Sequence, residues 1–82
     1  MNIQKLIEYY RNSTETRYLN QDELNFMCNI YQHMMVIHQS GSDDIIINSD
    51  DGDVLEFLKL LGYNASFIVD MHSDILGIRI KR

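Results

Sequence analysis

The sequence contains no proline and a single cysteine among its 82 residues. Without proline there is no sign of a rigid linker, so we predict one domain spanning residues 1–82. Because Cys28 has no second cysteine with which to form an internal disulfide, the chain suits a reducing cytoplasm. No apolar run is long enough to span a bilayer, and residues 1–5 lack the features of a signal peptide. We therefore expect a cytoplasmic protein that does not insert into membranes.

Basic residues are also scarce, with 7 lysines and arginines against 12 acidic residues and a net charge of −5. Phosphate groups repel such a chain, which argues against nucleic acid and favours a protein partner with a basic surface. The charge is uneven, because residues 1–41 carry a net charge of −1 and residues 42–82 carry −4. The last four residues, Arg79 to Arg82, reverse this trend with three positive charges.

Six of the acidic residues lie between Asp43 and Glu56. They flank one predicted strand and begin one predicted helix, so at least part of the set should form a negative patch. The candidate protein-binding residues are Asp43, Asp44, Asp50, Asp53 and Glu56. Two simpler interpretations remain, in which the charge only keeps the protein soluble or the acids only cap a helix in solvent.

The first half of the chain, residues 1–41, predicts two helices. An apolar stripe with helical spacing follows Asn2, a suitable N-cap, and contains Ile3, Leu6, Ile7 and Tyr10. The polar residues 12–16 then predict a loop. The second helix should begin with a capping box formed by Asn20 and Glu23 and should run to about Gln39, with Gly41 available to end it. Since it is apolar on most sides, we expect it to be central.

The second half, residues 42–82, predicts a β-α-β-β unit. Three isoleucines, Ile45–Ile47, suit a short strand covered on both faces. A helix should follow from Asp53 to Leu61, with an aspartate cap before it and Gly62 at its end. Alternating apolar residues then predict two half-buried strands that form an antiparallel hairpin, with Phe67, Val69 and Met71 on one and Leu76, Ile78 and Ile80 on the other. The predicted fold class is α+β.

The methionines of the second helix, together with Met71, have two possible roles, in a binding groove or in the core. Met27, Met34, Met35 and Met71 are of a kind found in adaptable binding grooves, and the same residues fill irregular cores in small domains. The second alternative is the one we favour. Exposed Tyr9, Tyr18 or the pair Met34 and Met35 would also support a homodimer.

No set of residues predicts a catalytic, cofactor-binding or metal-binding site. In the acidic run around Gly52, the first and last positions of a calcium loop fall on Ile47 and Leu58, which are not ligands. Zinc would require Cys28, His33, His38 and His72 to converge, yet the first three are five residues apart and point to different helix faces. A hydrolytic site would have to use His72 and Ser73 with Asp70 and Asp74, which are expected in a solvated loop.

Two resemblances extend these expectations. The segment Val54–Tyr63, a helix ending in a Leu-Gly-aromatic step, resembles the late helix of PUB domains, which implies a peptide-binding module. The whole chain resembles the small accessory proteins of low-GC tailed phages in being short, acidic, poor in proline and rich in Asn, Asp and Ile. That second resemblance implies an antiholin-like lysis regulator or an inhibitor of host defence, acting in the host cytoplasm.

The function that we expect is therefore a non-enzymatic one, the binding and modulation of another protein. A phage-type regulator or inhibitor is the first expectation and a PUB-like peptide-binding module is the alternative. A small enzyme or metal protein using His72 is the third.

Overall fold

The computed structural model describes residues 1–12 and 19–81, which form three helices and three strands. In chain order these are α1 (Ile3–Asn12), α2 (Gln21–Gln39), β1 (Asp44–Ile47), α3 (Gly52–Leu60), β2 (Asn64–Val69) and β3 (Ile75–Lys81). The α+β class, the order of the elements and the C-terminal hairpin are as predicted. Most of the predicted loop after α1, the side chain of Tyr18 and the charge of Arg82 lie outside the described residues.

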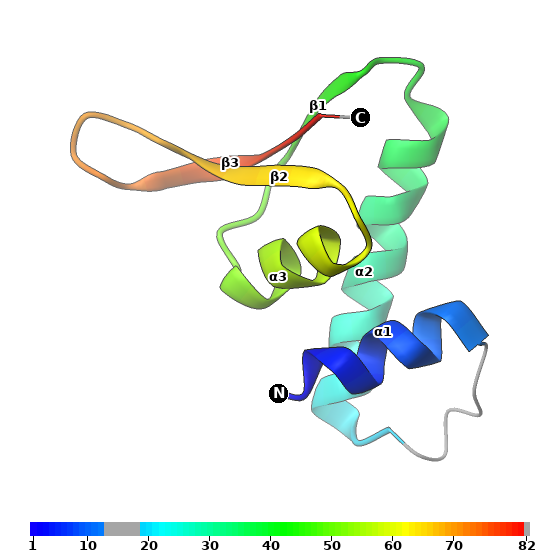
Figure 1. Ribbon diagram of the computed structural model, residues 1–82. Coiled ribbons are helices and arrows are strands. Elements are labelled where there is room, and N and C mark those ends of the chain that lie inside the picture. Colours follow the sequence, from blue (N-terminus) through cyan, green and yellow to red (C-terminus); the bar gives the residue numbers. More distant parts are fainter. Residues whose placement is uncertain (13–18, 82) are drawn as a thin grey trace.

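The three strands form one antiparallel sheet in the order β1-β3-β2, with the last strand of the chain in the middle. Ile45 lies opposite Ile80, and Ile80 lies opposite Ala65, so these three side chains share one face. α3 lies below this face, α1 lies below α3, and α2 runs alongside both helices (Figure 1). The core therefore forms between the sheet and the helical layer.

The other face of the sheet has no helix over it among the described elements. Ile46, whose side chain alternates with those of Ile45 and Ile47, is 64% exposed, while its two neighbours are buried. The prediction that this strand is covered on both faces is wrong. β1 is an edge strand in a sheet with helices on one side, so one face of it meets solvent.

The predicted helix caps are confirmed. Asn2 Oδ1 accepts a hydrogen bond from the amide of Lys5 at 3.2 Å and begins α1. Asn20 Oδ1 accepts one from the amide of Glu23 at 2.8 Å, and the Glu23 carboxylate accepts one from the amide of Asn20 at 2.9 Å. Asp51 caps α3 through the amide of Asp53. Each cap satisfies amides that the first turn of a helix leaves without partners.

α2 ends as predicted at Gln39, but glycine does not end it. The C-cap is Ser40, which has an extended backbone and donates its amide to Val36 O at 3.0 Å. Only part of the helix is buried, because Tyr31, Met35 and Val36 are all exposed. The helix therefore packs through one face, and its broad apolar character extends to the surface.

Phe57 of α3 is the centre of the core. Its side chain is fully buried, and its ring meets Tyr10 and Phe26 edge-on at centroid distances of 5.7 and 5.9 Å. This arrangement joins one aromatic ring from each helix. Met27 and Met34 are also buried, so for these two the core interpretation of the methionines is confirmed.

The β2–β3 hairpin extends well beyond the helices (Figure 1). In this projecting half Val69, Met71 and Leu76 are 55%, 92% and 58% exposed, so the prediction that they are half-buried is wrong. A register shift between Ile68 and Val69 interrupts the pairing at the same place. The shift leaves Leu76 as an extra residue between the pairs Ile68–Gly77 and Val69–Ile75, and no helix lies beneath this part of the hairpin to bury its side chains (Figure 1).

Candidate functional site

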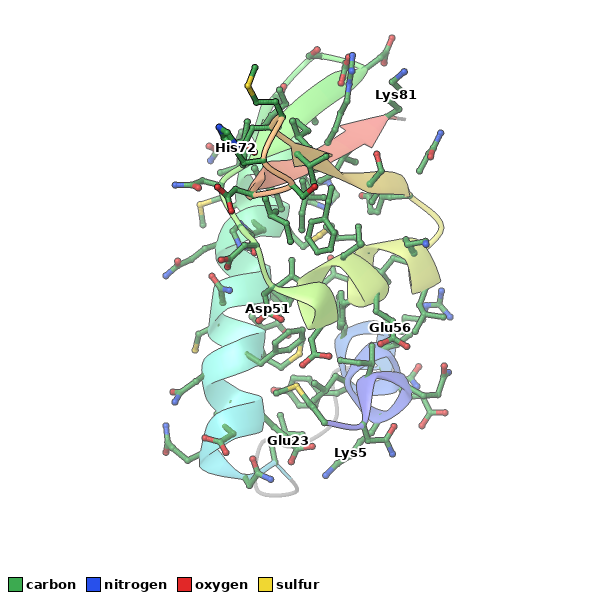
Figure 2. The ribbon with its side chains drawn as sticks, turned by 90° about the vertical axis from the view of Figure 1, so that its left-hand side faces the viewer. Lys5, Glu23, Asp51, Glu56, His72 and Lys81 are labelled. Carbon is green, nitrogen blue, oxygen red and sulfur yellow. The ribbon has the colours of Figure 1, made fainter. Side chains whose placement is uncertain are left out.

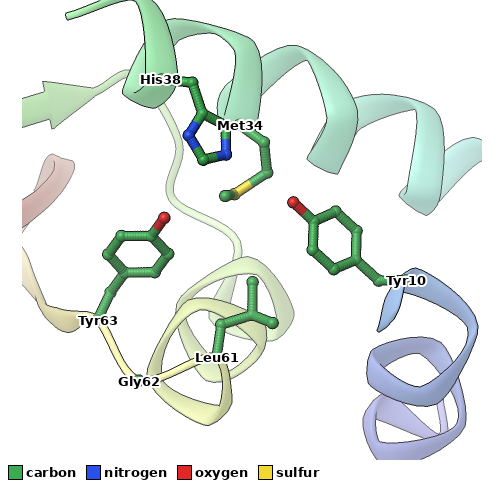
Figure 3. Close-up of a pocket in the computed structure, with 6 residues that line it drawn as sticks. All are labelled: Tyr10, Met34, His38, Leu61, Gly62 and Tyr63. Atoms are coloured by element: carbon green, nitrogen blue, oxygen red, sulfur yellow. The ribbon is translucent and has the colours of Figure 1, made fainter. Parts of the chain in front are cut away.

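A hollow of about 220 Å³ lies where the C-terminal parts of all three helices meet. Its lining comes from one residue of α1, two of α2 and the turn after α3, and consists of Tyr10, Met34, His38, Leu61, Gly62 and Tyr63. The rings of Tyr10 and Tyr63 stand on opposite sides, with Met34 and His38 above them and Leu61 below (Figure 3). This is the candidate functional site, and we call it the tyrosine hollow.

The end of α3 places Tyr63 at the hollow. Gly62 has a φ of 101°, a left-handed conformation that glycine adopts without steric cost. The amide of Gly62 donates to Lys59 O at 3.0 Å and that of Tyr63 donates to Leu58 O at 3.1 Å. This pair of bonds is the Schellman motif. Gly62 therefore fixes the direction in which the chain leaves the helix.

Tyr10 is held from two sides. Its ring contacts Phe57 in the core and Tyr31 of α2, the latter at a centroid distance of 5.8 Å. Next to it, the guanidinium of Arg11 donates to Leu60 O at 3.5 Å, which ties the end of α1 to the end of α3. Cations are favourable at the C-terminal end of a helix dipole. The rim of the hollow is thus anchored to the core.

The chemistry of the tyrosine hollow suits binding. Side-chain carbon and sulfur make up most of its walls, and two phenols and one imidazole supply the polar atoms. No carboxylate, hydroxymethyl or thiol group lines it. The described part of the chain contains no group of three or more histidine, cysteine or acidic residues placed to hold a metal ion. The arrangement can enclose an apolar group and offer hydrogen bonds at its edge.

The predicted acidic residues are divided between several places. Asp44 begins β1 and its carboxylate accepts hydrogen bonds from Arg79 of β3, including one between Nε and Oδ1 at 3.0 Å. This bond to Arg79, helped by nearby Lys81, lowers the pKa of Asp44. The charge of Asp44 is therefore balanced within the sheet, and the residue contributes little to a negative patch.

Asp53 lies at a second, polar hollow near the N-terminal ends of the three helices. Asp22 and Glu23 of α2 line the same hollow, together with residues 1, 2 and 20. Lys5 of α1 faces Glu23 and pairs with it at 3.2 Å (Figure 2). The amide of Asn20 and then the Lys5 ammonium lower the pKa of Glu23, although burial opposes them. The structure thus joins Asp53 to an acid that the sequence did not single out, Asp22.

The remaining predicted acids, Asp43, Asp50 and Glu56, are all exposed. Asp43 lies at the start of β1 and Asp50 lies past its end, while Glu56 lies along α3 toward α1 (Figure 2). None of the three forms an ion pair with another described residue. The set is therefore spread around α3 and β1, and Asp50, Asp53 and Glu56 are its members at or just before α3.

The candidate metal and hydrolytic residues are not brought together. Cys28 is exposed on α2, whereas His72 lies in the turn between β2 and β3, at the tip of the hairpin that projects away from the helices (Figure 1). The tip itself is a turn in which Asp70 Oδ1 accepts hydrogen bonds from the amides of His72 and Asp74 at 2.8 and 3.0 Å. Asp70 therefore shapes the turn, and Ser73 sits in it with a left-handed φ of 66°.

The sequence pointed to parts of the tyrosine hollow without locating it. Gly62 was predicted to end a helix, Tyr10 was assigned to an apolar stripe, and Met34 was discussed among the methionines of the second helix. The spacing of residues within one helix cannot show that the ends of α1 and α2 and the turn after α3 meet in space.

Within residues 1–12 and 19–81, none of the helices is both long and apolar enough to cross a membrane. Comparison of the chain with protein-family models, with curated proteins and with solved structures gave no match.

Proposed function

We propose that this protein is a non-enzymatic protein that binds and modulates another protein. The observation that carries the proposal is the tyrosine hollow, which is apolar, open to solvent and anchored to the core through Tyr10 and Phe57. Its volume of about 220 Å³ is below the 300–1,000 Å³ range typical of small-molecule sites. A space of this size suits one large side chain of a partner.

Anchoring by one buried side chain is how many protein interfaces gain their affinity. A few well-packed aromatic or apolar residues supply most of the binding energy, and the surrounding contacts exclude water. In the tyrosine hollow the two phenols present rigid rings with polar tips, and Met34 offers an adaptable thioether. A partner residue inserted there would meet both apolar walls and hydrogen-bonding groups.

The acidic residues indicate which charge the surface of the proposed partner should carry. The net charge of −5, with exposed Asp50 and Glu56 beside α3, favours a partner whose surface around the anchor is basic. Charges at the rim of an interface act mainly on the association rate and its salt dependence. We therefore assign anchoring to the tyrosine hollow and steering to the acids.

A selection from a random peptide library displayed on ribosomes tests the anchor and does not require the partner to be identified first. Wild-type protein should enrich peptides with one large apolar residue near lysine or arginine. His38→Trp should abolish this enrichment, because the indole would occupy the mouth of the hollow. Val36→Trp, on an exposed position of the same helix, is the matched control and should enrich the same peptides.

Enrichment of the same peptides by wild type and His38→Trp would overturn the assignment of the hollow. Thermal melting of the variants shows in advance that they remain folded. Failure of the wild type to enrich any peptide would also count against the anchor.

Steering is tested by the rate at which an enriched peptide or partner associates. Asp50→Lys with Glu56→Lys should slow association, and the defect should shrink at high salt. Glu8→Lys with Asp74→Lys makes the same change in net charge at exposed positions elsewhere. Equal slowing by both pairs would show that only net charge matters and that no acidic patch steers the partner.

The biological class remains part of the proposal. The short, acidic, Asn- and Ile-rich chain supports a phage-type lysis regulator or host-defence inhibitor. The tyrosine hollow also favours the alternative of a peptide-binding module, since a single anchor can hold a linear segment. Capture of a folded host protein that isolated peptides cannot displace would favour the regulator, and displacement by peptides would favour the module.

A further inference from the structure

The outer edge of β2 is unprotected. Because the strand order is β1-β3-β2, one side of β2 pairs with β3 and the other has no strand beside it among the described elements. Its six residues, Asn64–Val69, include no charged residue and no proline. Natural edge strands usually carry such residues to prevent pairing with another chain. β2 therefore offers a row of backbone groups to a further strand.

The opposite edge of the same sheet is protected. β1 has only four residues, and its first residue, Asp44, is held by Arg79 on the open face. A short strand with a charged end is a poor template for pairing. The sheet thus has one blunted edge and one available edge.

Charges of opposite sign mark the two ends of the hairpin. Asp70 and Asp74 lie at the tip, while Arg79 and Lys81 belong to the end of β3 near the base. Figure 2 shows His72 of the tip and Lys81 at opposite ends of the hairpin. Lys81 lies directly opposite Asn64, the first residue of β2. Because Arg79 is paired with Asp44, Lys81 supplies the positive charge at the base of this edge, while Asp70 and Asp74 supply negative charge at the tip.

We propose that a second copy of this chain pairs with β2 in antiparallel orientation, so that the two sheets form one six-stranded sheet about a two-fold axis. The same strand contributes to both sides of such an interface. An antiparallel arrangement places the acidic tip of each hairpin toward Lys81 at the base of its partner. A parallel arrangement would instead bring the two acidic tips together.

The same arrangement accounts for the projecting half of the hairpin. A two-fold axis perpendicular to the sheet leaves both helical layers on one side. The exposed Val69 of each copy then lies beside the base of the partner's sheet, above the partner's helices. Strands in a sheet are about 4.8 Å apart, so Asp70 of one copy comes to roughly 10 Å from the strand that carries Lys81 in the other. The argument for this interface does not use the tyrosine hollow, although Tyr63, which lines the hollow, directly precedes β2.

Ser66 provides the test, because it is exposed and lies near the middle of β2, close to the proposed axis. In Ser66→Lys two lysines face each other in the dimer, and in Ser66→Glu two glutamates do. Each variant alone should dimerise about two- to fivefold more weakly than wild type in sedimentation equilibrium, because like charges directly opposite each other are destabilising. Mixed in equal amounts, the two should recover dimers that contain one copy of each, because the opposite charges then meet.

Ile46→Lys is the control, since it places a lysine on the same open face at the blunted edge of the sheet. It should dimerise as the wild type does. Wild-type protein that stays monomeric at every concentration would overturn the proposal. So would dimers that Ser66→Lys and Ser66→Glu leave intact, dimers that Ile46→Lys weakens equally, or a mixture of the two Ser66 variants that shows no recovery.

Discussion

The base and the tip of the β2–β3 hairpin have similar sequences and very different surroundings. At the base Ala65, Ile78 and Ile80 are 7%, 0% and 0% exposed. At the tip Val69 and Leu76 are 55% and 58% exposed, although they continue the same apolar pattern. α3 packs below the base and no helix extends below the tip (Figure 1). Alternation tells which side chains share a face, whereas burial depends on whether another element covers that face.

The largest effect is expected below the base. Phe57→Ala should lower the free energy of unfolding by about 3–5 kcal/mol, because it removes a fully buried ring that contacts Tyr10 and Phe26. Domains of this kind have about 5–15 kcal/mol in total, so the variant would be close to unfolding. Met71→Ala at the tip should change the value by less than about 0.5 kcal/mol. Urea denaturation measures both, and an unchanged midpoint for Phe57→Ala would show that the core lies elsewhere.

Two substitutions in β3 compare the buried base and the exposed tip of the hairpin on one strand. Ile78→Ala should cost about 2–5 kcal/mol, because its side chain is fully buried between the sheet and the helices. Leu76→Ala, two residues away, should cost less than about 0.5 kcal/mol in the monomer. Equal losses would mean that the tip is covered in solution, for example by a second copy of the chain. Repeating the measurement at several protein concentrations separates these possibilities.

Gly77 lies at the boundary between base and tip. A Cβ at this position would be 2.7 Å from the carbonyl oxygen of Ile47, so β1 would have to shift away from β3. We expect Gly77→Ala to cost about 1–3 kcal/mol. Gly52→Ala, where no atom lies within 4 Å of the new methyl group, should be neutral or stabilise α3 by up to about 1 kcal/mol. Amide hydrogen exchange should show faster opening of β1 in Gly77→Ala alone.

The smallest effect is expected on the pH dependence of stability and comes from His33 of α2. Burial lowers the pKa of His33, whose Nε2 is enclosed without a hydrogen-bond partner in the described structure. The unfolded chain, with a pKa near the ordinary 6.5, therefore binds a proton more readily than the folded protein. The free energy of unfolding should not depend on His33 above that pH, and it should decrease as the pH falls below it toward the folded-state pKa of His33. The melting temperature of His33→Gln should show a weaker dependence over the same range, and an identical dependence would contradict this role.

Local signals in the sequence predicted the ends of the helices well. The capping box at Asn20 and Glu23 and the glycine at position 62 each depend on neighbours within one turn, so the sequence is sufficient to recognise them. Gly41 does not end α2, and the wrong predictions for Ile46 and for the tip of the hairpin concerned coverage by other elements. No local pattern records how far a helix extends beneath a sheet.

The candidate site was harder to predict for the same reason. Tyr10, His38 and Tyr63 come from three elements, and their meeting depends on the packing of the helices against Phe57. The pairing of Asp44 with Arg79 joins residues 35 positions apart and removes one acid from the predicted patch. Asp22 was not singled out because it lies in a different helix from Asp53.

The central place of β3 has a consequence for the order in which the protein folds. β3 lies between β1 and β2 but follows both in the chain, so neither strand has a partner until β3 has been made. Ribosomes add about 5–20 residues per second, which leaves β2 without β3 for roughly a second. The hairpin then closes locally within about 1–10 μs, whereas β1 must wait for a loop of some 35 residues to close. We therefore expect the sheet to grow outward from its central strand, with the β2–β3 hairpin formed first and β1 joining last.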